Sequence, residues 1–422
     1  MKKVTIESIN VDFNKVVIEF SSSKDISKYF NEMIFKAEYF LDGKEIDLSN
    51  VPQGLVVIPL LCNILPVTWV SNAILYVPEL DKQFYEAIPE FKRGFIDMYP
   101  DCEFQGELQI DRIVENNLKE SVSDSAVFFS AGVDAYCTLA QHIDENPDLI
   151  TVWGSDIPYD NESGWNTLYE VIRTEASKLQ LPHIVIKSNF RKVVNESALS
   201  MDFRVKLRDS WWHGIQHGIG LIGLASPICY NRGIQNLYIA ASYCEETYRK
   251  CASDPSIDNY VRFAKTRTIH DSFISRQKKI KIISDKHKEG LPVDLHVCWQ
   301  NTTGMNCCVC EKCTRTIMGL FAEGELPKEY GFPSDENVYF NCAKLCKYKF
   351  EYDDIASPFW KQIQQRAKQN IDLINERDLH KFIYPVFEID FDKINNSPRR
   401  VLRRLCNKVK ARIRRLIKIK NL

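Results

Sequence analysis

The segment AVFFSAGVDAYCTLAQHI, residues 126–143, decides the fold of this chain. A short apolar strand, AVFFS, runs into the small-residue turn SAGVDA, and a helix-like stretch, YCTLAQHI, follows. Small residues let the backbone N–H groups of a turn face an anion, and the start of a helix adds its positive dipole end. The segment therefore predicts a phosphate-binding loop at a strand–helix junction. It is not a Walker A loop, because no GxxxxGK[ST] pattern lies near it.

Strand-like and helix-like patterns alternate along the chain from residue 126 to residue 242. Strands are expected at 126–130, 148–154, 183–188 and 236–242, and helices at 134–143, 165–180 and 211–230. Such alternation predicts βαβ units, and hence an α/β fold of the PP-loop or Rossmann-like kind, with a parallel sheet and helices on both faces. Ligands of these sheets bind beyond the carboxyl ends of the strands.

Four regions are expected along the chain. Residues 1–120 read as a β-rich accessory domain with strands at 4–11, 15–21, 35–41 and 73–77 and a helix at 81–99. Residues 121–325 form the α/β domain and its metal lobe, and 326–395 form a helical extension with its clearest helix at 358–374. The uncharged stretch 48–77 is broken by Pro52, Pro59 and Pro66, so we expect buried strands with turns and not a membrane span.

The charge of the chain is unevenly distributed. The formal net charge is −1, yet residues 393–422 hold 12 Lys and Arg and no acid, which leaves 43 basic against 56 acidic residues in the remainder. The hydrophobic spacing over residues 402–416 makes the basic tail, residues 396–422, an amphipathic helix with a cationic face. We expect it to meet an anionic partner, either a membrane surface or RNA; docking on the protein's own acidic body is the alternative.

Fourteen cysteines occur in the chain, and four are closely spaced. The N-terminus has no apolar signal region, so we expect a cytoplasmic protein, peripheral to the membrane if the tail binds lipid, with its cysteines reduced. Cys298, Cys307, Cys310 and Cys313 read C-x8-C-x2-C-x2-C, a spacing that closes a tetrahedral shell around a metal. Zinc is expected, and an iron–sulfur cluster is the rival. Cys308 lies between the second and third ligands and competes with them.

The turn resembles the S-G-G-x-D-S loop of the PP-loop ATP pyrophosphatases. That resemblance implies ATP binding by Ser130, Ala131, Gly132, Asp134 and Ala135, with Mg²⁺ or a nucleotide hydroxyl on Asp134. Ala131 replaces a glycine, a change that is tolerated where φ is negative. Ala135 replaces the final serine, so one phosphate-contacting hydroxyl is missing. Trp153 and Gly154, after the second strand, and Ser242, after the fourth, complete the expected ATP site.

The cysteine spacing resembles the zinc site of the 7-cyano-7-deazaguanine synthase family, and the resemblance covers Val127 to Gly324. Within that family, the chain is most similar to a branch with an extra N-terminal domain, through IAASY at 239–243 and VCWQN…NCCVCEKCTRT at 297–316. The resemblance implies ATP-dependent conversion of a carboxylate to an amide or nitrile with ammonia, as in 7-deazaguanine (queuosine) biosynthesis. The implied zinc is structural, because four thiolates leave no open coordination position.

The expected mechanism and the resemblance together suggest roles for residues that lie between the two motifs. Arg276 and Lys279 would neutralise the departing pyrophosphate, and His217 or His270 would accept the proton of ammonia. Asp258 and Asp271 are expected on the substrate side. Packing of His217 against the sheet, and a solvated helix face for Arg276 and Lys279, are equally good interpretations.

The sequence therefore predicts an adenylating carbon–nitrogen ligase that uses ATP, Mg²⁺ and Zn²⁺ with a small carboxylic acid, such as a deazapurine, and ammonia. A homo-oligomer is left open. A tRNA sulfurtransferase and a sugar amidotransferase of the same superfamily are alternatives. A non-catalytic nucleotide or base sensor, as in phage defence, is a further alternative that Ala135 favours.

Overall fold

The computed structural model describes all residues except 299, 301–304, 355, 396–397, 399–405 and 407–422. Most of the basic tail therefore lies outside the described residues. The described strands form one sheet in the order β11-β12-β10-β7-β8-β9-β3-β2-β1-β5-β6, with β4 paired to β3. Their bounds are β1 (Lys3–Asp12), β2 (Lys15–Ser22), β3 (Ile34–Leu41), β4 (Lys44–Glu45), β5 (Ile74–Asp81), β6 (Glu107–Val114), β7 (Ser125–Phe128), β8 (Asp148–Trp153), β9 (His183–Ser188), β10 (Asn236–Ala240), β11 (Arg262–Phe263) and β12 (Thr266–Asp271).

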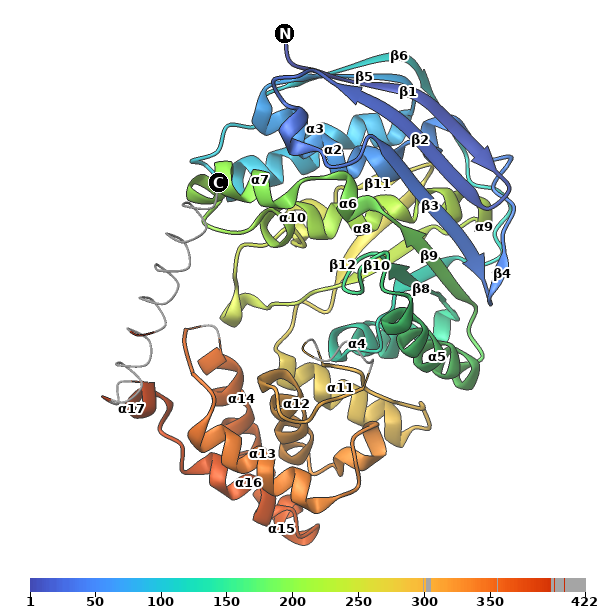
Figure 1. The fold of residues 1–422 in the computed structure, drawn as a ribbon. Helices are drawn as coiled ribbons and strands as arrows, with labels where there is room; N and C mark the ends of the chain where they lie inside the picture. The colour runs from blue at the N-terminus through green and yellow to red at the C-terminus, as the bar shows by residue number, and fades with distance from the viewer. Residues whose placement is uncertain (299, 301–304, 355, 396–397, 399–405, 407–422) are drawn as a thin grey trace.

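The sheet is mostly parallel. Strands β12, β10, β7, β8 and β9 run parallel in succession, as the βαβ pattern predicts. The antiparallel pairing of β9 with β3 joins them to the N-terminal strands. The sheet therefore runs without a break across the boundary expected at residue 120 (Figure 1).

Helices cover both faces of the sheet. Those before the metal lobe are α1 (Gln53–Val56), α2 (Ile58–Ser71), α3 (Lys82–Met98), α4 (Val133–His142), α5 (Glu162–Leu179), α6 (Phe190–Val193), α7 (Glu196–Leu207), α8 (His217–Leu224), α9 (Ser226–Arg232), α10 (Pro255–Asp258) and α11 (Arg276–Lys288). A hydrophobic core lies on each face of the sheet. Successive side chains of β8 point into one core and then the other, because strand side chains alternate between the two faces. Ile150 packs in the core that holds α2 and α8, whereas Leu149 packs in the core that holds α4 and α5.

A helical lobe follows α11 at the lower end of the molecule in Figure 1. It contains α12 (Glu311–Ala322), α13 (Glu336–Tyr348), α14 (Ala356–Gln369), α15 (Ile371–Glu376), α16 (His380–Phe387) and α17 (Phe391–Asn395). The single helix expected at 358–374 is divided at Asn370 into α14 and α15. Helices α4, α11 and α12 pack in succession, which brings the lobe against the loop after β7.

Two further secondary-structure expectations are wrong. The stretch 48–77 forms α1 and the buried helix α2 before it reaches β5, and not a set of strands. Pro59 lies in the first turn of α2, where its missing N–H costs nothing, and the apolar residues on nearly every side suit a helix buried all round. The single helix expected at 211–230 is broken into a π-helical turn, Trp212–Gln216, followed by α8 and α9.

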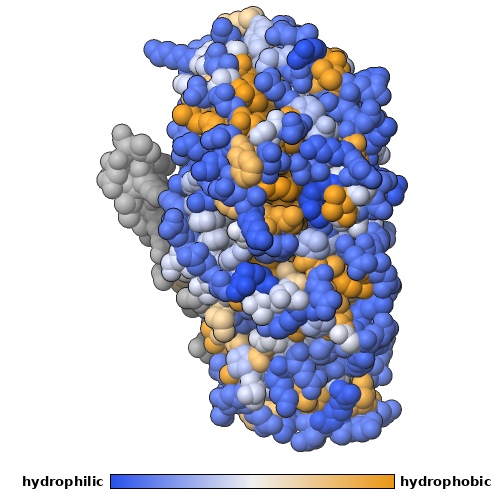
Figure 2. Space-filling view, turned by 90° about the vertical axis from the view of Figure 1, so that its right-hand side faces the viewer, coloured by the Kyte–Doolittle hydropathy of each residue, from blue (hydrophilic) through white to orange (hydrophobic). Residues whose placement is uncertain are grey.

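No helix among the described residues is long and apolar enough to cross a membrane. On the face drawn in Figure 2, hydrophobic residues lie in several groups with hydrophilic ones between them.

Candidate functional site

The loop of residues 130–132 joins β7 to α4 at the carboxyl edge of the sheet. Ala131 has a φ of 56°. The alanine therefore does not adopt the negative φ at which its replacement of glycine would be tolerated. The loop is tied from the other side, because the His296 N–H donates to the Ala131 carbonyl over 2.8 Å. An L-residue in this left-handed region costs about 1–2 kcal/mol, so the loop stores strain at the expected phosphate site.

Asp134, in the first turn of α4, binds two cations from α11. Its Oδ1 accepts from Lys279 Nζ at 2.8 Å and its Oδ2 from Arg276 Nη1 at 3.2 Å. Burial alone would raise the pKa of Asp134, but Lys279 and Arg276 outweigh it and hold that pKa well below the usual range. Lys279 Nζ also donates to the Ala241 carbonyl at the end of β10. The structure thus brings together three of the predicted residues at the start of α4.

Two further cations of α12, Lys312 and Arg315, lie close enough to Asp134 and Arg276 for the charges to interact. The Arg315 guanidinium lies 4.2 Å from the centroid of the Phe359 ring. Burial lowers the pKa of Lys312, and the neighbouring Arg276 lowers it further. Burial likewise lowers the pKa of Arg315 to about 10, although Glu311 lies 3.6 Å from its Nε. Arg276 Nε is buried and has no hydrogen-bond partner among the described residues.

This basic cluster, defined as Arg276, Lys279, Lys312 and Arg315, contains more positive charge than its near carboxylates balance. Asp134 binds two of its members, Glu311 lies near Arg315, and Asp156 acts on Lys312, so four cations face three carboxylates. Uncompensated buried cations are costly, and an anion placed among them removes that cost. The cluster and the loop of residues 130–132 together therefore have the chemistry of an anion site.

The four predicted metal ligands come together. The Sγ atoms of Cys298, Cys307, Cys310 and Cys313 all lie within 4.8 Å of one another. The Cys307 and Cys313 sulfurs are 4.0 Å apart, close to the roughly 3.8 Å edge of a tetrahedron with 2.3 Å metal–sulfur bonds. Backbone N–H groups of Cys310 and Cys313 donate to the sulfurs of Cys307 and Cys310 at 3.3 and 3.4 Å. The cluster fits a metal such as zinc.

Cys308 does not belong to this ligand group. Its φ is 53°, its side chain is buried, and its Sγ donates to the Asn306 carbonyl over 3.6 Å. Burial raises the pKa of Cys308 to about 12, so it stays a thiol at neutral pH. The competition expected from Cys308 is therefore not seen among the described residues.

The predicted histidines lie at the same edge of the sheet. His270, at the end of β12, binds Asp258 through Nδ1 at 2.9 Å, and Asp258 also accepts from Ser253 Oγ at 2.7 Å. The second Asp258 oxygen is buried without a partner among the described residues. His217 begins α8, packs edge-on against Trp212 and has its pKa lowered by burial.

Asp271 lies apart from these groups. Its carboxylate accepts from Gln141 at 3.2 Å and lies 3.4 Å from His142 Nε2, both in the last turn of α4. Asp134 occupies the first turn of that helix, so about 10 Å of helix separates the two carboxylates. Ser242 is exposed directly after Ala241, whose carbonyl binds Lys279, and so lies beside the anion site.

Trp153 is packed by its neighbours. Its ring stacks on Trp165 with centroids 5.0 Å apart, and the Lys187 ammonium lies 4.0 Å from its centroid. Gly154 has a φ of 115°, and a Cβ there would lie 1.9 Å from the Ser188 carbonyl oxygen. Only glycine fits this junction of β8 and β9. A recess of about 240 Å³ opens here.

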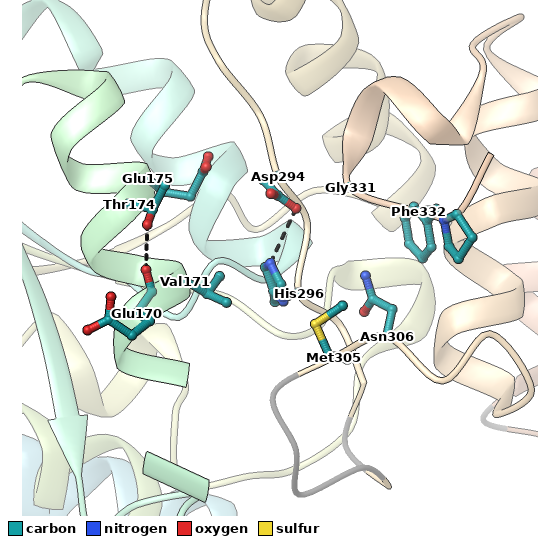
Figure 3. A pocket seen from close by; sticks show the side chains of 11 residues that line it. Glu170, Val171, Thr174, Glu175, Asp294, His296, Met305, Asn306, Gly331 and Phe332 are labelled. Carbon is teal, nitrogen blue, oxygen red and sulfur yellow. Dashed lines mark hydrogen bonds and ion pairs between the residues drawn. The ribbon is translucent and has the colours of Figure 1, made fainter. Parts of the chain in front are cut away.

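A larger cavity, of about 580 Å³, lies between α5 and three segments around the metal ligands, at residues 294–296, 305–306 and 331–333 (Figure 3). Its acidic side chains have partners: Glu175 accepts from Tyr136 and Lys178, and Asp294 faces His296 across 3.2 Å. An acidic lining repels a polyphosphate, so this cavity does not extend the anion site.

The sequence interpretation missed Lys312 and Arg315. Both belong to the run CEKCTR, in which they alternate with the ligands Cys310 and Cys313. That alternation was a sequence signal that both cations lie beside the metal site, at the start of α12. What the sequence did not reveal is that α12 packs against α11, which directs this turn toward Asp134. The chain matches no model of a protein family, no curated protein and no solved structure.

Proposed function

We propose that this protein is an ATP-dependent adenylating ligase similar to the 7-cyano-7-deazaguanine synthases. The observation that carries the proposal is the basic cluster beside the loop of residues 130–132. Four cations with an incomplete set of carboxylates, at the start of a helix that follows a parallel strand, suit a polyphosphate. The recess beside Gly154 lies at the ends of neighbouring strands, where the base of the nucleotide would be expected.

Each part of the site has a role in adenylation. An oxygen of the substrate carboxylate attacks the α-phosphorus of ATP, and pyrophosphate leaves with the electrons of the broken P–O bond. Lys279, Lys312 and the guanidinium groups neutralise the charge that develops on pyrophosphate. Both Asp134 oxygens already accept from Lys279 and Arg276, so Mg²⁺ would enter this site on the phosphates and not on Asp134. A nitrogen nucleophile then attacks the acyl carbon and displaces AMP.

The four-cysteine site has a supporting role in this proposal. Zinc in a closed four-thiolate shell activates no water, so its contribution is to fix the first turn of α12 and with it Lys312 and Arg315.

A nucleotide sensor is the second candidate. It is favoured by Ala135, whose methyl group lies buried in α4 where the related loops have a serine, and by the ion pairs that already hold Asp134. Such a protein would bind ATP without cleaving it.

The decisive experiment follows AMP, ADP and the nitrile by mass spectrometry, with purified protein, Mg-ATP, ammonium and 7-carboxy-7-deazaguanine. We expect AMP that depends on the acid, and a rate about 10²-fold lower in Lys312→Met because one cation is lost from the pyrophosphate site. Lys281→Met is the matched control, since Lys281 is an exposed residue of α11 that pairs with Asp285. ADP, or ATP binding without turnover, would contradict the ligase and favour the sensor.

A further inference from the structure

A further histidine–aspartate pair, His213 and Asp209, lies near the anion site and is not among the sequence-predicted residues. His213 Nδ1 lies 2.5 Å from the Asp209 carboxylate, and His213 Nε2 lies 3.3 Å from the Tyr243 hydroxyl. Such an arrangement fixes the tautomer: Nδ1 carries a proton toward Asp209, and Nε2 accepts from Tyr243.

The backbone here is unusual. His213 lies in the π-helical turn Trp212–Gln216, just before α8. π-Helical turns are rare and often occur at functional sites, because the wider turn re-aims the side chains that it carries. The turn is held in place from outside the helix: the Tyr99 hydroxyl donates to the Gly214 carbonyl at 2.9 Å, and the Ala252 N–H donates to the His213 carbonyl at 2.7 Å.

Hydrogen bonds and chain proximity connect this group to the anion site. Tyr243 follows β10 by three residues, and the Ala241 carbonyl before it accepts from Lys279, which in turn binds Asp134. Arg315 lies close enough to Tyr243 to influence its pKa, which burial raises. Asp209, His213 and Tyr243 thus form a hydrogen-bonded series whose Tyr243 end lies near Arg315 of the basic cluster.

Accessibility distinguishes His213 from the predicted base His270. The His213 side chain is 34% exposed, whereas that of His270 is 1% exposed and already bound to Asp258. His217 is partly exposed like His213, but its ring packs edge-on against Trp212 and no carboxylate hydrogen bond orients it among the described residues. A base for an incoming nucleophile must be both reachable and oriented, which His213 satisfies.

We infer that His213, acting through the Tyr243 hydroxyl and oriented by Asp209, accepts the proton of the nitrogen nucleophile in the transfer half of the proposed reaction. As nitrogen bonds to the acyl carbon, the bond from that carbon to the AMP oxygen breaks and AMP leaves with its electron pair. The nitrogen passes a proton to Tyr243, and the Tyr243 proton moves to His213 Nε2. Asp209 stabilises the resulting imidazolium.

This inference rests on the proposed function, and the two half-reactions separate them. ATP–pyrophosphate exchange with 7-carboxy-7-deazaguanine reports adenylation, and amide formation with ammonium reports transfer. We expect His213→Gln and Tyr243→Phe to keep exchange within about 2-fold of wild type and to transfer ammonia about 10²-fold more slowly. His380→Gln is the control, because His380 also pairs with a carboxylate, Asp378 at 3.5 Å, but lies in the helical lobe outside this group.

Hydroxylamine provides the second readout. It is largely unprotonated at neutral pH and is a strong nucleophile, so transfer to it should be restored to within about 5-fold of wild type in His213→Gln and in Asp209→Asn, whereas a merely structural role would leave it impaired. Full ammonia transfer by His213→Gln, or equal loss with both nucleophiles, would overturn the relay while the ligase stands. Absence of acid-dependent exchange in the wild-type protein would instead overturn the proposed function itself.

Discussion

Ala131 shows how one backbone angle affects the anion site. Its φ of 56° is the conformation in which glycine carries no steric cost, and the backbone hydrogen bond from His296 holds it there. The residue types of this loop were readable from the sequence, but the sign of φ was not, because it depends on the segment near residue 296 that packs across the loop. The sequence likewise identified Arg276 and Lys279 as candidate cations, but it did not show that both bind Asp134, because that contact forms only when α11 packs against α4.

We expect Ala131→Gly to leave the protein equally stable or to raise its free energy of unfolding by up to about 1 kcal/mol, since relief of the strained φ exceeds the added entropy of the unfolded chain. The matched control, Ala140→Gly within α4, should lower it by about 1 kcal/mol because that alanine has helical geometry. Urea unfolding of the three proteins measures both changes. Equal losses in both variants would argue against strain at Ala131.

At the scale of elements, α12 connects the four-cysteine site to the basic cluster. Cys310 caps the helix, Cys313 lies in its first turn, and Lys312 and Arg315 alternate with them. Most longer strands of both halves, and helices such as α3 and α5, were predictable from their periodicity, whereas strands β6 and β12 were not predicted. Helix α2 was not, because its prolines suggested turns, and a helix apolar on every side has no amphipathic pattern to recognise.

Loss of the metal should therefore weaken anion binding. We expect purified protein to contain metal by elemental analysis, with zinc distinguished from iron in the same measurement. Cys310→Ser should lose it and bind pyrophosphate at least 10-fold more weakly in calorimetry, since the turn that bears Lys312 loses its anchor. Cys406→Ser, at an exposed cysteine outside the cluster, is the control. Unchanged pyrophosphate affinity in metal-free protein would separate the two sites.

At the scale of the whole molecule, the seam between β3 and β9 makes one sheet of the two halves. The core on one side draws on both of them: the Tyr39 hydroxyl donates to the Leu224 carbonyl at 3.0 Å, and Gln216 donates to Asn63 at 2.8 Å. The sequence predicted the strands on each side of the seam but not their pairing. An antiparallel join between distant segments leaves no local pattern, whereas βαβ units do.

A fragment comprising residues 121–422 should consequently fail to fold. It would expose the β9 edge and the faces of α8 and α9 that pack on α1 and α2. We expect insoluble protein, or a soluble form without cooperative unfolding and without pyrophosphate binding, whereas the full chain should melt in a single transition by calorimetry. A well-folded fragment that binds pyrophosphate would show that the halves are independent.

The same seam has a consequence for synthesis on the ribosome. Strand β3 is complete at Leu41, but its partner β9 begins at His183, so on the order of ten seconds of translation separates the two. The apolar residues of α2 remain uncovered for longer still, because Ile219 and Ile222 of α8, which pack in the same core, are synthesised later than β9. During that interval the nascent chain presents an unpaired strand edge and an uncovered apolar helix, which are the features that chaperones bind.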